Sequence, residues 1–158
     1  MDILTLSKTV NQRASQLGKT ITTAESCTGG MLAAALTDVP GSSSIFERGY
    51  VTYSDAAKIA MLGVSAQVLD TYGAVSENVA QQMATGALSA AQADIAIAIT
   101  GIAGPGGTDH KPEGLVCFAL AQSGHPTHSV TVEFSALGRS RVRTESVLYA
   151  LGLLIAAL

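Results

Sequence analysis

The sequence predicts an α/β protein, a three-layer α/β/α sandwich around a mostly parallel, mixed sheet of about five strands. Helical patterns of apolar residues alternate with short strand patterns along the chain. The run Ile95–Ile99 is apolar throughout, as in a central strand buried on both faces. Hydrophobic residues make up 47% of the chain but aromatic residues only 4%, so Ala, Val, Ile and Leu must build the core. We expect the 158 residues to form one domain, 1–158.

Helices are expected where apolar residues recur every three or four positions. The first such pattern begins at Ile3 and ends near Gly18, and the clearest one follows Ser76, a residue type that caps helices well. Ser54 is a similar cap for a short helix that carries Lys58. The expected helices are residues 3–17, 31–36, 55–62, 66–71, 77–91 and 139–158.

Strands are expected where β-branched, aromatic or apolar residues form short runs. Gly-rich and Pro-rich segments separate these runs, notably Val39–Ser44 and the loop 101–114. The last two runs follow one another without a helix between them, so we expect part of the sheet to be antiparallel. The expected strands are residues 20–24, 46–53, 95–99, 115–121 and 129–134.

Charge and cysteine content exclude several classes of function. A net charge of -3 and a pI near 5.5 argue against a nucleic-acid-binding protein, because neutralising phosphates requires a basic face. Cys27 and Cys117 form no CxxC motif and no secretory leader is visible, so we expect reduced thiols and a cytoplasmic protein. The apolar run Val147–Leu158 is too short to cross a membrane. We expect it to form a buried terminal helix or to pack against a second copy in a homo-oligomer.

The segment Thr22–Gly30, with the sequence TTAESCTGG, is the most informative part of the chain. A strand pattern ends here, and a helical pattern begins at Met31. Two adjacent glycines at a helix start let a ligand approach free backbone N–H groups, with the positive end of the helix dipole behind them. Ser26 and Cys27 precede these donors, which suits either an anion site or a nucleophile beside an oxyanion hole. The alternatives are an N-cap role for Ser26 and a core role for Cys27.

Three polar or Gly-rich segments, 24–30, 53–58 and 100–107, each follow an expected strand. Ligands of open α/β sheets bind at the carboxyl ends of the strands, so these segments are expected to converge. The candidate neighbours are Ser26, Tyr53, Lys58 and Thr100.

A base for Ser26 has to come from this group. The three histidines lie late in loops and fit no hydrolase motif, so the expected base is a lysine with a lowered pKa. Lys58 is the best placed, with Tyr53 able to orient or relay a proton. The alternative is that Lys58 is a solvated helix residue.

The loop Thr100–Gly107 follows a buried strand, and its glycines can admit a ligand close to the backbone. The alternative for Gly106 and Gly107 is that they only form a tight turn. Asp109, His110 and Glu113 fit no recurrent spacing of metal ligands, so we expect no metal site.

Arg139 and Arg143 are four positions apart and share a face at the start of the last helix. Cations in a first turn oppose the helix dipole, so this arrangement favours a nearby anion. A solvated face with Glu145 close by is the alternative.

Several of these stretches keep a common order and spacing over nearly the whole chain. They are Thr23–Gly30, Phe46–Lys58, Gly73–Ser76, Thr100–Pro105, Lys111–Gly114 and the arginines Arg139 and Arg143. Through this set the sequence resembles the CinA C-terminal-domain family in its stand-alone form, the nicotinamide mononucleotide (NMN) amidohydrolases. One departure concerns the residues before the last helix, where family members often carry Gly-Asp-Arg and this chain has Leu137-Gly138-Arg139.

The resemblance implies hydrolysis of the carboxamide of NMN to nicotinic acid mononucleotide and ammonia, in pyridine nucleotide salvage, with neither metal nor cofactor. It implies a catalytic set of Ser26, Lys58 and Tyr53. The implied substrate-binding residues are Cys27, Thr28, Gly29, Gly30, Thr100, Gly101, Ala103, Gly104, Arg139 and Arg143. Backbone N–H groups of either glycine-rich loop would hold the oxyanion, and the other loop would cradle the phosphate. The alternative function is a non-catalytic, regulatory nucleotide- or phosphate-binding module.

Overall fold

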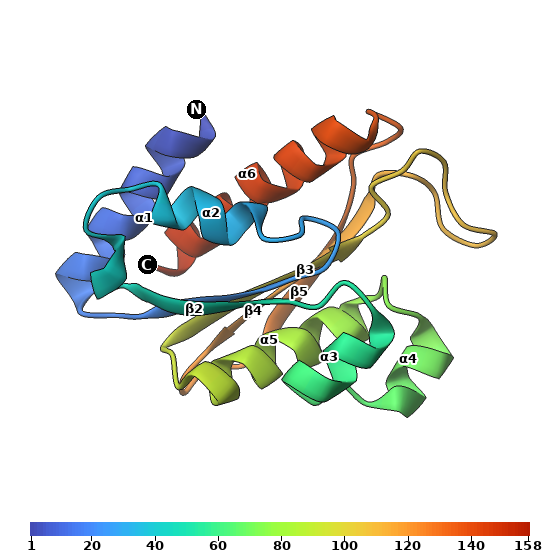
Figure 1. The fold of residues 1–158 in the computed structure, drawn as a ribbon, viewed down its shortest axis with the longest axis horizontal. Helices are drawn as coiled ribbons and strands as arrows, with labels where there is room; N and C mark the ends of the chain where they lie inside the picture. The colour runs from blue at the N-terminus through green and yellow to red at the C-terminus, as the bar shows by residue number, and fades with distance from the viewer.

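The structure, a computed structural model, describes residues 1–158 and confirms the α/β class. Helices α1, α2 and α6 cover one face of the sheet, and helices α3, α4 and α5 cover the other (Figure 1). The helices are α1 (Ile3–Leu17), α2 (Met31–Thr37), α3 (Asp55–Leu62), α4 (Ala66–Tyr72), α5 (Glu77–Ala91) and α6 (Arg139–Ala157), with a 3-10 turn η1 (Ser42–Ser44). The strands are β1 (Ile21–Glu25), β2 (Phe46–Val51), β3 (Ile95–Gly101), β4 (Leu115–Gln122) and β5 (His128–Glu133).

The five strands form one sheet in the order β2-β1-β3-β4-β5. Strand β1 pairs in parallel with both β2 and β3, whereas the β3–β4 and β4–β5 pairs are antiparallel, as the sequence predicts. The carboxyl ends of β1, β2 and β3 therefore meet at one edge of the sheet. In Figure 1 the loops that follow these three strands lie together at the right-hand end, beside the start of α6.

Most element ends agree with the expected ones because their caps are local. Ser54 and Ser76 accept hydrogen bonds from the N–H groups of Ala57 and Val79, which fixes the starts of α3 and α5. Strand β2, by contrast, ends at Val51 rather than continuing to residue 53. The Thr52 N–H donates to the Glu25 carbonyl, and the chain then turns into the cap of α3.

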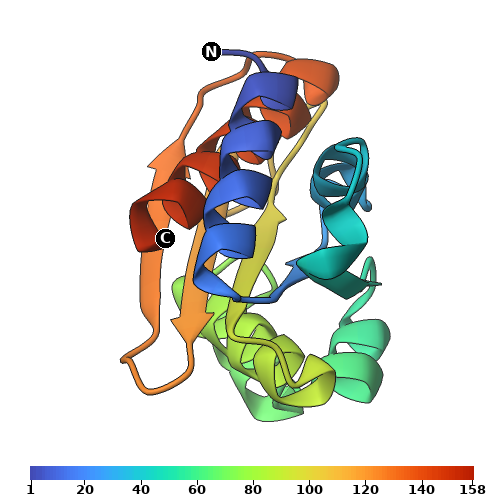
Figure 2. The same ribbon diagram turned by 90° about the vertical axis from the view of Figure 1, so that its left-hand side faces the viewer.

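The core has two parts, one on each face of the sheet. Along β3, Ile95, Ile97 and Ile99 pack toward α1 and α6, whereas Ala96 and Ala98 face α5. Small residues on the second face let α5 lie close to the sheet. Helices α1 and α6 lie side by side on the first face (Figure 2).

The apolar end of the chain belongs to this core. Val147, Ala150, Leu151 and Leu154 of α6 are fully buried, so the expectation of a buried terminal helix is confirmed. A homo-oligomer stays a prediction. None of the helices combines the length and the hydropathy that crossing a lipid bilayer requires.

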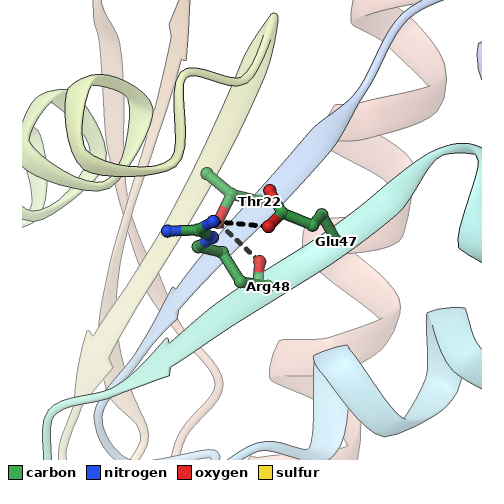
Figure 3. A network of polar contacts seen from close by, with 3 residues as sticks. All are labelled: Thr22, Glu47 and Arg48. Atoms are coloured by element: carbon green, nitrogen blue, oxygen red, sulfur yellow. Dashed lines mark hydrogen bonds and ion pairs between the residues drawn. The ribbon is translucent and has the colours of Figure 1, made fainter.

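The edge strand β2 contains an irregularity opposite Thr22. Between the pairs of Ile21 with Phe46 and of Thr23 with Gly49, two residues of β2 face one residue of β1. The Thr22 hydroxyl donates to the Arg48 carbonyl at 2.8 Å, and the Arg48 side chain forms an ion pair with Glu47 (Figure 3). Such a bulge, with charged side chains at an edge, discourages pairing with another chain.

Gly86 provides a test of the packing that positions α3. A Cβ atom at Gly86, in the middle of α5, would overlap the carbonyl oxygen of Leu62 at the end of α3. Gly86→Ala is therefore expected to destabilise the protein by about 1–3 kcal/mol, as overpacking does. In α6, Gly152 faces open space, so Gly152→Ala is expected to stabilise by about 0.5–1 kcal/mol. Urea unfolding of both variants measures the difference, and similar effects at the two sites would contradict the close α3–α5 contact.

Candidate active site

Ser26 and Lys58 form the central contact at the carboxyl edge of the sheet. Ser26 follows the last residue of β1, and Lys58 projects from α3. The Lys58 Nζ donates to Ser26 Oγ at 2.9 Å and to the Thr52 carbonyl oxygen at 2.8 Å. Lys58 is only 1% exposed, so the solvated-helix alternative is wrong. Ser26 is half-buried.

The structure of α3 explains why a lysine is buried here. Lys58 and Leu62 are the only buried residues of this helix and lie four positions apart on the face directed toward the protein. Burial lowers the pKa of the Lys58 amine, and the Asp55 carboxylate opposes this shift only in part. A lowered pKa favours the neutral amine, which is the form that can accept a proton.

Glu25 is a residue of the site that the sequence analysis did not single out. Its carboxylate is fully buried and accepts hydrogen bonds from the Thr28 hydroxyl at 2.7 Å and from the N–H groups of Leu32 at 2.9 Å and Ala33 at 3.0 Å. The charge thus lies at the positive end of α2 and holds the loop that carries Ser26. The motif T-A-E-S contained the signal, because an acidic residue just before a helix start suits that position.

The hydrogen bonds of Glu25 show that the expectation of free N–H groups at the start of α2 was wrong. Glu25 occupies the donors of the first turn, and the Gly29 N–H donates to the Ser26 carbonyl. The N-cap of α2 is Gly30, so the N-cap alternative for Ser26 is wrong. Six N–H groups of the two glycine-rich loops have no acceptor within the protein: those of Cys27, Thr28, Gly30, Ala103, Gly104 and Gly107.

Arg139 lies at the same edge of the sheet, but its contacts are with neutral groups and not with an anion. Its guanidinium donates to the Gly104 carbonyl at 2.7 Å and to the Tyr53 hydroxyl at 2.6 Å. Tyr53 is 60% exposed and forms no hydrogen bond with Ser26 or Lys58. Tyr53 is therefore hydrogen-bonded to Arg139 and not to Ser26 or Lys58.

Arg143 contacts the loop that carries Ser26. It donates from Nε to the Cys27 carbonyl at 3.1 Å and from Nη2 to the Thr28 carbonyl at 3.3 Å. Neither Arg143 nor Arg139 pairs with a carboxylate. The two ion pairs of the protein join Arg48 to Glu47 and Arg141 to Glu145. Two guanidinium charges at this edge of the sheet thus remain free to attract an anion.

Two other expected residues have mainly structural contacts. Burial raises the pKa of the Cys27 thiol to about 11, which suits a core residue and not a nucleophile. The Thr100 hydroxyl donates to the Ala74 carbonyl at 2.9 Å and so fixes the turn before α5. A cavity of about 660 Å³ lies between that turn and the loop 102–111, and neither Ser26 nor Lys58 lines it.

The fold and the site together define an α/β/α sandwich whose parallel strands end at a serine, a buried lysine and two unpaired arginines. The model of the CinA C-terminal domain matches residues 3–158, and the chain belongs to this family. It is 49% identical over 151 residues to the nicotinamide-nucleotide amidohydrolase PncC of Escherichia coli K12, covering 95% of this chain and 91% of that protein.

Some relatives are longer proteins. The chain is 51% identical over 118 residues to a CinA-like protein of Chlorobium limicola, which covers 74% of this chain but only 28% of that protein. Among solved structures, the competence/damage inducible protein CihA of Agrobacterium tumefaciens superimposes with a TM-score of 0.96 at 44% identity, covering 99% of this chain and 95% of that one.

Replacing the buried carboxylate tests the role of Glu25. Glu25→Gln keeps the size of the side chain, but its amide NH2 faces N–H donors and leaves at least one of them unpaired. We expect a loss of about 1–3 kcal/mol in the free energy of unfolding. Glu47→Gln, on the exposed edge strand, is the matched control and is expected to change stability by less than about 0.5 kcal/mol. Urea unfolding measures both, and equal effects would contradict the account of Glu25.

Proposed function

We propose that this chain is a nicotinamide-nucleotide amidohydrolase that hydrolyses the carboxamide of NMN to nicotinic acid mononucleotide and ammonia. The observation that carries the proposal is the 2.9 Å hydrogen bond between the buried Lys58 amine and the hydroxyl of the half-buried Ser26. A serine activated by a lysine with a lowered pKa is a recurrent solution for amide hydrolysis. The 49% identity to the Escherichia coli protein of that name supports the choice of substrate.

In the proposed reaction, Ser26 Oγ attacks the carboxamide carbon and the neutral Lys58 amine takes the hydroxyl proton. The tetrahedral intermediate then collapses, the C–N bond breaks, and the Lys58 ammonium returns the proton to the departing ammonia. Water attacks the resulting acyl-serine ester while Lys58 takes a proton from it and delivers that proton to Ser26 Oγ. Lysine thus acts as base and acid in turn, and no metal is required.

Stabilisation of the oxyanion requires N–H donors that the protein leaves unused. The N–H groups of Gly30, Ala103 and Gly104 are among those that fit this requirement, because none of the three has an acceptor within the protein. Backbone donors fixed by surrounding structure stabilise a developing oxyanion without reorganisation.

The phosphate of NMN would bind at Arg139 and Arg143. Both guanidinium groups donate only to neutral oxygen atoms, so their charge is uncompensated. Guanidinium groups are well suited to phosphate because several N–H donors lie in one plane. Tyr53, held by Arg139, would line the same side of the substrate.

Ammonia release from NMN by the purified protein tests this function. Ser26→Ala and Lys58→Met are each expected to lower kcat by at least about a thousandfold, since each removes a group that reacts or moves a proton. Ser15→Ala and Lys8→Met, which change the same residue types on the exposed face of α1, are expected to retain wild-type activity.

Two outcomes would contradict the proposal. One is no ammonia release by the wild-type protein, and binding of NMN without turnover would then indicate the regulatory binding module. The other is equal activity of the site variants and the α1 controls, which would exclude the serine–lysine mechanism even if NMN is hydrolysed. Thermal unfolding of every variant checks that lost activity is not lost folding.

A further inference from the structure

Glu113 lies outside the serine–lysine pair, yet it contacts both segments that hold Arg139. Its Oε1 accepts a hydrogen bond from the Gly106 N–H at 2.6 Å, and its Oε2 accepts one from the Gly138 N–H at 3.1 Å. One carboxylate therefore joins the loop after β3 to the residue that precedes α6.

The two anchored segments are the ones that meet at Arg139. Arg139 follows Gly138 directly, and its guanidinium donates to the carbonyl of Gly104, two residues before Gly106. Gly138 supplies no side-chain cap to α6, so the start of this helix lacks a local restraint of that kind. The carboxylate of Glu113 provides a restraint from a distant part of the sequence.

The Glu113 side chain, which is half-buried, packs closely against the backbone at Gly104. A Cβ atom at Gly104 would overlap the Glu113 carboxylate, and the backbone there has a φ of +90°, which side chains rarely adopt. Glycine at this position thus leaves room for the Glu113 side chain to lie against the loop.

Glu113 is not an ion-pair partner of Arg139. Its oxygen atoms accept from backbone N–H groups, and Glu113 forms no ion pair with Arg139. The carboxylate can therefore fix the position of the guanidinium without direct pairing, which leaves the positive charge available to a substrate anion.

From these contacts we infer that Glu113 is a positioning residue for substrate binding, acting through Arg139 on the phosphate of the nucleotide. The inference rests on the proposed function for the identity of the substrate. It assigns to Glu113 an effect on KM for a phosphorylated substrate, and not on the chemical step at Ser26.

The test compares Glu113→Gln with Asp109→Asn, which removes one negative charge from the exposed part of the same loop. For Glu113→Gln, KM for NMN is expected to rise about tenfold, the effect of losing one charged hydrogen bond, with kcat changed by less than about twofold. KM for nicotinamide riboside, which has the carboxamide but no phosphate, is expected to be unchanged. Asp109→Asn is expected to match the wild type with both substrates.

A double variant tests whether the effect passes through Arg139. In the Arg139→Ala background, Glu113→Gln is expected to raise KM for NMN no further, since the group that it positions is absent. Fully additive effects would overturn the inference, as would equal rises in KM for NMN and the riboside, or a KM for NMN within twofold of wild type. If Glu113→Gln does not fold, Glu113→Asp takes its place, with a smaller rise in KM expected and the same outcomes decisive.

Binding measurements separate this inference from the proposed function. Calorimetric titration of NMN into Ser26→Ala and into Ser26→Ala with Glu113→Gln needs no turnover, and Kd is expected to rise about tenfold in the second protein. An absence of ammonia release by the wild type would contradict the amidohydrolase proposal alone. An unchanged Kd would overturn the role of Glu113 alone.

Discussion

The buried amine of Lys58 is the constraint on which the site depends. A lysine in a protein interior loses its hydration, and that loss must be offset by hydrogen bonds from the amine. Here the offset comes from Ser26 Oγ at 2.9 Å and the Thr52 carbonyl at 2.8 Å. Both partners lie where strands of the parallel sheet end, so the lysine joins α3 to the ends of β1 and β2. Lys58 forms no ion pair, and its amine is the group that accepts and returns the proton in the proposed reaction.

Backbone groups, more than side-chain pairs, hold the charged residues at this edge of the sheet. Glu25 and Glu113 accept from backbone N–H groups, whereas Arg139 and Arg143 donate to backbone carbonyls. Such contacts fix the position of a charge without cancelling it. The site thus keeps positive charge next to a nucleophile in a protein whose net charge is -3, which suits an anionic substrate.

The sequence alone predicted those features that depend on local patterns and on topology. The layers, the partly antiparallel sheet and the caps Ser54 and Ser76 follow from periodicity and local chemistry. The approach of Ser26 to Lys58 follows from the rule that strand ends converge.

Local sequence patterns did not predict the contacts between segments that lie far apart in the sequence. The position of Glu113 was missed because its partners are backbone N–H groups of distant segments, which carry no residue-type signal. Tyr53 was expected beside Lys58 because both belong to the segment 53–58 that follows an expected strand. It lies instead against Arg139, because β2 ends at Val51 and the chain turns before Tyr53.

The most direct test of the central claim is the protonation of the Lys58 amine in the folded protein. An NMR titration that follows the lysine side chains, with Lys58 assigned from its absence in the Lys58→Met spectrum, gives the pKa of this one group. We predict a pKa below 10.5, because burial disfavours the ammonium form more than Asp55 favours it. A pKa at or above 10.5 would mean that Lys58 is held as a cation, and it would contradict its assignment as the base for Ser26.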